Sequence, residues 1–186
     1  MRLILLCLLL TNVFADANIE KLDWNGVETI WLKDDRFSSY YLTVYFADGA
    51  ISDRKGRDGE TALMFNMLDS GTRRYDQQFI SDTLEFYGAS YGASVTHEYS
   101  TFSVSGLVKD IIPTMKMVCE IFNDATFPKR EVRKRKVQIR NELNNLVSSH
   151  SALADRIFRR LSLDKTPYQL PPEGNGRTIK KISRND

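Results

Sequence analysis

The chain has 186 residues, of which 42% are hydrophobic and 11% aromatic, and its formal net charge is +2 at pH 7. This composition excludes an intrinsically disordered chain, and so small a net charge gives no reason to expect a nucleic-acid partner. The length allows one domain with a substantial hydrophobic core.

The first 15 residues have the pattern of a secretory signal peptide. Arg2 gives a short basic start, and residues 3–10 form an apolar run. Cleavage before Asp16 fits the small residue that precedes it, and cleavage after Ala17 is the alternative. A membrane anchor is less consistent with this segment, because a spanning helix needs ~20 apolar residues. We therefore expect a secreted protein without a membrane span, and the periplasm is the expected compartment.

Cleavage at this site would leave Cys119 as the only cysteine, which excludes an intramolecular disulfide. Cys119 lies among Met, Val, Ile and Phe residues, so we expect it to be a buried, unreactive side chain.

Hydrophobic patterns predict strands and helices in the order strand, strand, helix, helix, strand, strand, helix, helix. The expected strands are residues 27–32, 40–46, 90–97 and 99–108. The first expected helix is buried, begins at about residue 61 and is ended by Gly71. Further helices are expected at residues 76–87, 110–124, 129–147 and 152–161. Residues 166–176 are rich in proline and glycine and predict a loop, and 178–183 predict a short turn with no evident buried side chain. This order favours an α+β fold with an antiparallel sheet packed against helices.

Five segments in the same order resemble the N-terminal domain of the pitrilysin/insulinase-like zinc metallopeptidases. They are Leu68-Asp69-Ser70-Gly71-Thr72, residues 84–94, the strand pair through residues 97–106, Asp124-Ala125-Thr126-Phe127-Pro128, and the charged helix of residues 131–142. The resemblance extends over about residues 39–185. It implies one domain over residues 16–186. The same resemblance implies that this domain is truncated at its C-terminal end.

The resemblance also identifies the positions of the family's zinc signature, His-x-x-Glu-His. Counting back from Gly71, the two histidine positions fall on Ala62 and Asn66, and the glutamate position falls on Phe65. In active members the histidines and a distant glutamate, here near Glu142, bind zinc, and the signature glutamate is the general base. Ala62 has no ligating atom, Phe65 removes the base, and Asn66 offers only a neutral amide oxygen.

One carboxylate cannot hold zinc, so we expect no catalytic residue, no bound metal and no cofactor, with Glu142 a surface or structural remnant. Restoring the signature by Ala62→His, Phe65→Glu and Asn66→His should restore metal binding if Glu142 points inward.

No alternative site is evident. The two histidines, His97 and His150, belong to different predicted elements, and no Gly-x-Ser-x-Gly motif accompanies a serine nucleophile. Residues 129–136 hold six basic residues in eight. A solvated helix face is the favoured interpretation, and the alternatives are a nucleic-acid patch and a surface for an acidic partner or an anionic membrane.

These observations predict a catalytically inactive, peptidase-like protein that works in peptide processing or degradation. The expected partner is an active homologue in a heterodimer, and the expected ligand is a peptide or an unfolded protein. Two alternatives stay open. One is a working zinc metalloendopeptidase, and the other is a stand-alone module that binds peptides in a cleft lined by Met64 and Phe65.

Overall fold

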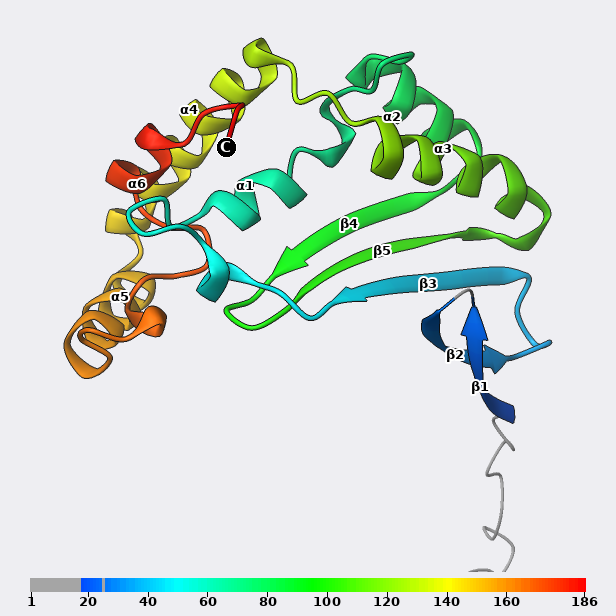
Figure 1. The fold of residues 1–186 in the computed structure, drawn as a ribbon, viewed down its shortest axis with the longest axis horizontal. Coiled ribbons are helices and arrows are strands. Elements are labelled where there is room, and N and C mark those ends of the chain that lie inside the picture. Colours follow the sequence, from blue (N-terminus) through cyan, green and yellow to red (C-terminus); the bar gives the residue numbers. More distant parts are fainter. Residues whose placement is uncertain (1–17, 25) are drawn as a thin grey trace, which may run out of the picture. The chain divides into compact units, whose positions relative to one another are not determined.

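The computed structural model describes residues 18–24 and 26–186 and divides the chain into two units (Figure 1). The first unit ends at Ser38, and the second comprises Ser39–Asp186. The predicted signal peptide lies outside the described residues. Within these residues, no helix combines the length and the apolar character that crossing a membrane requires.

The first unit contains an antiparallel hairpin of β1 (Asn18–Trp24) and β2 (Val27–Lys33). The pattern of β2 predicted its strand, but β1 was not predicted. Its apolar residues Ile19, Leu22 and Trp24 fall on both faces of the hairpin, so they show no alternation. The strand therefore depends on pairing with β2 rather than on its own pattern.

The second unit is built on a three-stranded antiparallel sheet in the order β3-β5-β4. Its strands are β3 (Ser39–Phe46), β4 (Ser90–Val95) and β5 (Ser100–Leu107). One face of β5 is buried through Phe102 and Val104, as the alternation in the sequence predicts.

Three helices lie on one side of this sheet, namely α1 (Glu60–Phe65), α2 (Gln77–Phe86) and α3 (Ile111–Asp124) (Figure 1). The first hydrophobic cluster fills the space between the sheet and these helices. Its buried members are Phe65, Leu68, Ile80, Leu84, Ala89, Phe102, Val104, Met117, Val118 and Ile121. The predicted α+β fold with helices packed against an antiparallel sheet is confirmed.

The remaining helices are α4 (Lys129–Asn145), α5 (His150–Ser162) and α6 (Gly176–Lys181). A second hydrophobic cluster joins α1 to α4 and α6. Its buried members are Leu63, Met67, Val132, Ile139, Ile179 and Ile182. The expectation that residues 178–183 form a turn without buried side chains is wrong, because Ile179 is fully buried.

Two further expectations need correction. The helix expected to continue to Gly71 ends at Phe65, and Leu68–Ser70 forms a separate 3-10 turn before the glycine. Asn66 is the C-cap of this helix, and its side-chain amide donates to the Ala62 carbonyl one turn earlier, at 2.7 Å. Cys119 is exposed rather than buried, since α3 turns Met117, Val118 and Ile121 toward the core instead.

We expect Ile179→Ala to lower the free energy of unfolding by about 2–5 kcal/mol, because it leaves a cavity in the second cluster. Urea denaturation followed by circular dichroism measures the change. Ile112→Ala is the matched control on α3, where the side chain is 67% exposed, and should cost less than about 0.5 kcal/mol. Equal costs for the two variants would contradict the burial of α6.

Candidate functional site

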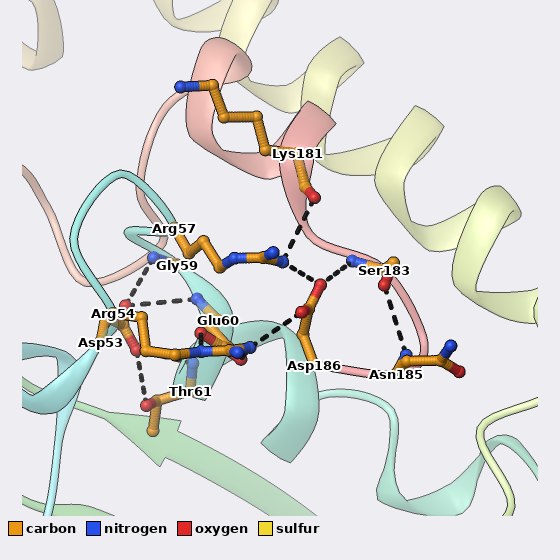
Figure 2. A network of polar contacts seen from close by, with 10 residues as sticks. All are labelled: Asp53, Arg54, Arg57, Gly59, Glu60, Thr61, Lys181, Ser183, Asn185 and Asp186. Atoms are coloured by element: carbon orange, nitrogen blue, oxygen red, sulfur yellow. Dashed lines mark hydrogen bonds and ion pairs between the residues drawn. The ribbon is translucent and has the colours of Figure 1, made fainter.

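The start of α1 is fixed by a carboxylate from the preceding loop (Figure 2). Asp53 accepts hydrogen bonds from the backbone N–H groups of Gly59 at 2.6 Å, Glu60 at 3.2 Å and Thr61 at 2.9 Å. The hydroxyl of Thr61 donates to the same carboxylate at 2.6 Å. A helix N-terminus leaves such N–H groups without partners in the helix, and a negative charge there is favourable. Asp53 therefore caps the start of α1 from the loop that precedes it.

The same loop is joined to the last residues of the chain by ion pairs (Figure 2). Arg54 contacts Asp186 at 3.0 Å and also pairs with Glu60, and Arg57 pairs with Asp186. The Ser183 backbone N–H donates to the Asp186 carboxylate at 2.6 Å. This hydrogen bond lowers the pKa of Asp186 to about 2 against the opposing effect of burial, with smaller contributions from hydrogen bonds of the Ser183 and Arg54 side chains and from the charge of Arg57. The network holds the segment after α6 beside the start of α1.

Of the three positions that the resemblance gives to the zinc signature, Ala62 and Phe65 lie on α1 and Asn66 is its C-cap, and their side chains do not form a metal site. Ala62 is 4% exposed and Phe65 is 7% exposed, so both belong to the interior. Asn66 is exposed, yet its amide nitrogen is bonded to the Ala62 carbonyl. Zinc sites need imidazole, thiolate or carboxylate groups aimed at one point, and none of these three residues has such a group.

The Phe65 ring belongs to an aromatic cluster that extends from α1 into the first core. It meets Phe46 of β3 edge-on, with ring centroids 5.2 Å apart, and Phe46 stacks with Phe122 of α3 at 6.1 Å. Phe122 in turn meets Phe102 of β5 edge-on at 4.8 Å. Such pairs contribute about 0.5–1.5 kcal/mol each beyond the burial of their area. Phe65, which the resemblance places at the position of the general base, is therefore a side chain that stabilises the core.

The distant glutamate position lies on the surface of α4. Glu142 has a side chain that is 61% exposed and contacts Arg135 at 3.4 Å. Its neighbour Leu143 packs against the second cluster, so this part of α4 faces the cluster that includes α1 residues, while the Glu142 carboxylate faces solvent. The structure thus places Glu142 in an exposed ion pair, and among the described residues it brings no second candidate ligand to it.

The remaining candidates are also dispersed. The Nε2 atom of His97 lies 2.9 Å from the Leu170 carbonyl oxygen, in the loop before α6, whereas His150 is exposed at the first turn of α5. Over residues 18–24 and 26–186, no group of three or more His, Cys, Asp or Glu side chains is arranged to hold a metal ion. The residues present do not fit the zinc of active relatives.

Comparison with known proteins explains this arrangement of helix and sheet. The sequence model of the family described as insulinase (peptidase family M16) matches residues 29–171. The chain belongs to the insulinase family, M16. This confirms the resemblance of the sequence to pitrilysin/insulinase-like peptidases. A curated relative is subunit 1 of the mitochondrial cytochrome b-c1 complex of Bos taurus, which is 20% identical over 146 residues, or 77% of this chain.

Solved structures share the fold. The crystal structure of a peptidase M16 inactive domain from Pseudomonas fluorescens matches 89% of the chain with a TM-score of 0.83 and 21% identity. Pitrilysin matches 89% of the chain with a TM-score of 0.72 and 15% identity. The chain covers 30% of the bovine subunit, 41% of the Pseudomonas protein and 18% of pitrilysin, so it spans less than half of each of these proteins.

Sequence reasoning located the signature positions but missed the contacts that hold this M16 helix in place. Asp53 lies in a polar loop several residues before the helix, so no capping pattern marks it. The only feature of the sequence that could have indicated this cap is a short acidic side chain that precedes the glycine at the start of the helix, Gly59. Gly59 is needed there because its φ is +97° and a Cβ would lie 2.5 Å from the Glu173 carbonyl oxygen.

We expect the triple variant Ala62→His, Phe65→Glu, Asn66→His to bind no zinc and to lose at least about 3 kcal/mol of stability, because it buries a carboxylate in an aromatic core. Elemental analysis and urea denaturation measure the two effects. The double variant Ala62→His, Asn66→His is the control that keeps Phe65. Stoichiometric zinc in the folded triple variant, lost again on Glu142→Ala, would show that Glu142 turns inward.

The Asp186 network predicts a dependence of stability on acid. The pKa of Asp186 is lower in the folded chain than its ordinary 3.8, so its contribution is present above about pH 4 and is lost as the pH falls toward about 2. The urea midpoint of the chain should exceed that of Asp186→Asn at pH 6, and the two should converge by about pH 2. A difference that stays constant over this range would contradict the assignment.

Proposed function

We propose that this chain is a catalytically inactive M16 protein that serves as the partner subunit of an active homologue in peptide processing or degradation. One observation carries the proposal, namely that Phe65 occupies the position of the general base and packs in the aromatic core. A metallopeptidase needs a metal-bound water and a base beside it. Neither function can be supplied by Ala62, Phe65 or Asn66, whose side chains have no basic group and no zinc-binding group.

The solved M16 domain described as inactive supports the proposal, since the present chain shares its fold. The bovine relative supports it in a different way. That protein is a subunit of a larger complex, which is consistent with M16 chains that work within assemblies. We infer from this that the present chain contributes binding surface to an assembly rather than chemistry.

The sheet offers a place at which a peptide could be held. Within the described residues, β4 pairs only with β5, so its other edge has free backbone N–H and carbonyl groups, and α1 packs close to this strand. An extended peptide can add to such an edge through main-chain hydrogen bonds, with little dependence on its sequence. Ser90, Gly92 and Ser94 are exposed along β4 and leave room beside the edge.

Zinc content and peptide hydrolysis of the purified chain test the inactive state. We expect elemental analysis to find no stoichiometric zinc. We also expect the chain to show no chelator-sensitive cleavage of a fluorogenic peptide library. Stoichiometric zinc together with chelator-sensitive cleavage by the chain alone would favour the working metalloendopeptidase instead.

Co-purification tests the partner role. A homologue from the same genome with an intact His-x-x-Glu-His should co-elute with this chain on size-exclusion chromatography and should cleave peptides faster in its presence. A homologue that never co-elutes would contradict the partner role and favour a stand-alone peptide-binding module. The proposal also includes export, so the amino terminus of the protein isolated from cells should begin at Asp16 or just after Ala17.

A further inference from the structure

A basic groove lies between α4 and the segment that follows α6. It has a volume of about 510 Å³. Six of its lining residues are cationic, and no Asp or Glu side chain lines it in the described part of the chain. The cations are Lys129, Arg133, Lys136, Arg140, Lys180 and Arg184. The groove is far from neutral although the chain carries a net charge of only +2.

The cations of α4 form a stripe along one side of the helix. Lys129, Arg133, Lys136 and Arg140 follow the i, i+4, i+7, i+11 spacing, which places them within about 60° of one another around the helix. The stripe is about 17 Å long at the rise of an α-helix. Lys180 and Arg184 face it from the other wall of the groove. The stripe therefore has the length of a short peptide segment rather than that of a single small ion.

Basic residues on the other sides of α4 have carboxylate partners, and those of the groove do not. Arg130 and Lys134 contact Glu131 at 3.8 and 3.6 Å, and Arg135 contacts Glu142. Within residues 18–24 and 26–186, no carboxylate oxygen lies within 4.0 Å of Lys129, Arg133, Arg140 or Lys180. Like charges one turn apart on a helix repel each other. An anionic ligand would relieve this repulsion.

Lys136 has a structural role within the groove. Its ammonium donates to the carbonyl oxygens of Lys180 at 3.0 Å and Ile182 at 2.5 Å, which completes the end of α6. Asp186 is held by Arg54 and Arg57 (Figure 2). It does not line the groove, and its charge raises the pKa of Lys136 there against the larger lowering by burial.

The floor of the groove is apolar. Val132 and Ile182 are buried beneath the cations, and Val137 is half exposed at the side. No aromatic ring lines the groove, so bases of a single-stranded nucleic acid would have nothing on which to stack. A lipid surface is flat and would not enter a groove between two walls. A peptide in which carboxylates alternate with apolar side chains matches both the positive charge of the groove walls and the apolar floor.

We propose that this groove binds an acidic, partly apolar peptide segment of a partner protein. The proposal is independent of the absence of catalysis and of the β4 edge. It replaces the expectation that the basic run is only a solvated helix face.

Fluorescence anisotropy of a labelled peptide of about six residues, in which Glu alternates with Leu so that an extended chain matches the length of the stripe, tests the proposal on the full chain. We expect saturable binding that weakens with added salt. The variant Arg133→Gln, Arg140→Gln should lower the affinity by roughly tenfold, because each exposed ion pair contributes up to roughly fivefold. The matched control Arg130→Gln, Lys134→Gln removes the same charge from another side of α4 and should leave the affinity within about twofold.

Several results would overturn the proposal. The first is that the peptide does not bind. The second is that its affinity falls equally in the two double variants, because the attraction would then be a general effect of charge. The third is that the same peptide with Gln in place of Glu binds as tightly as the acidic peptide. A single-stranded oligonucleotide or vesicles of phosphatidylglycerol that bind more tightly than the peptide, and lose affinity in the groove variant, would replace the peptide as the ligand.

Discussion

The structure of the second unit depends on the way α1 is held between two hydrophobic clusters. Phe65 and Leu68 pack toward the sheet, α2 and α3, whereas Leu63 and Met67 pack toward α4 and α6. A helix of six residues is too short to be stable by itself. Burial on opposite sides, together with the Asp53 cap, gives it a single position. The elements around α1 are in turn placed by their contact with it.

This packing and a zinc site compete for the same residues. In an active relative, the ligand positions must be polar and open to a water molecule. Here Ala62 and Phe65 are interior residues, and the Phe65 ring continues the aromatic cluster through Phe46 and Phe122. The chain therefore keeps the fold of family M16, and Ala62 and Phe65 of α1 contribute to its core.

The sequence was sufficient to predict the sheet and the longer helices, which depend on local periodicity, and the family, which depends on motifs in a fixed order. It was insufficient where distant segments meet. The burial of Ile179 depends on α4 and α1, and six residues are too few to show a helical pattern. The exposure of Cys119 follows from which side of α3 faces the sheet. The cap by Asp53 and the stripe of cations that faces Lys180 and Arg184 likewise require segments to come together in space.

The account rests on the claim that α1 is a packing helix rather than a metal-binding one. Anomalous diffraction at the zinc absorption edge, from crystals of the chain grown with excess zinc, tests this claim most directly. We predict no anomalous peak between α1 and α4 and a Phe65 ring in contact with Phe46. An ordered zinc ion bound by Asn66 and Glu142 would contradict the account.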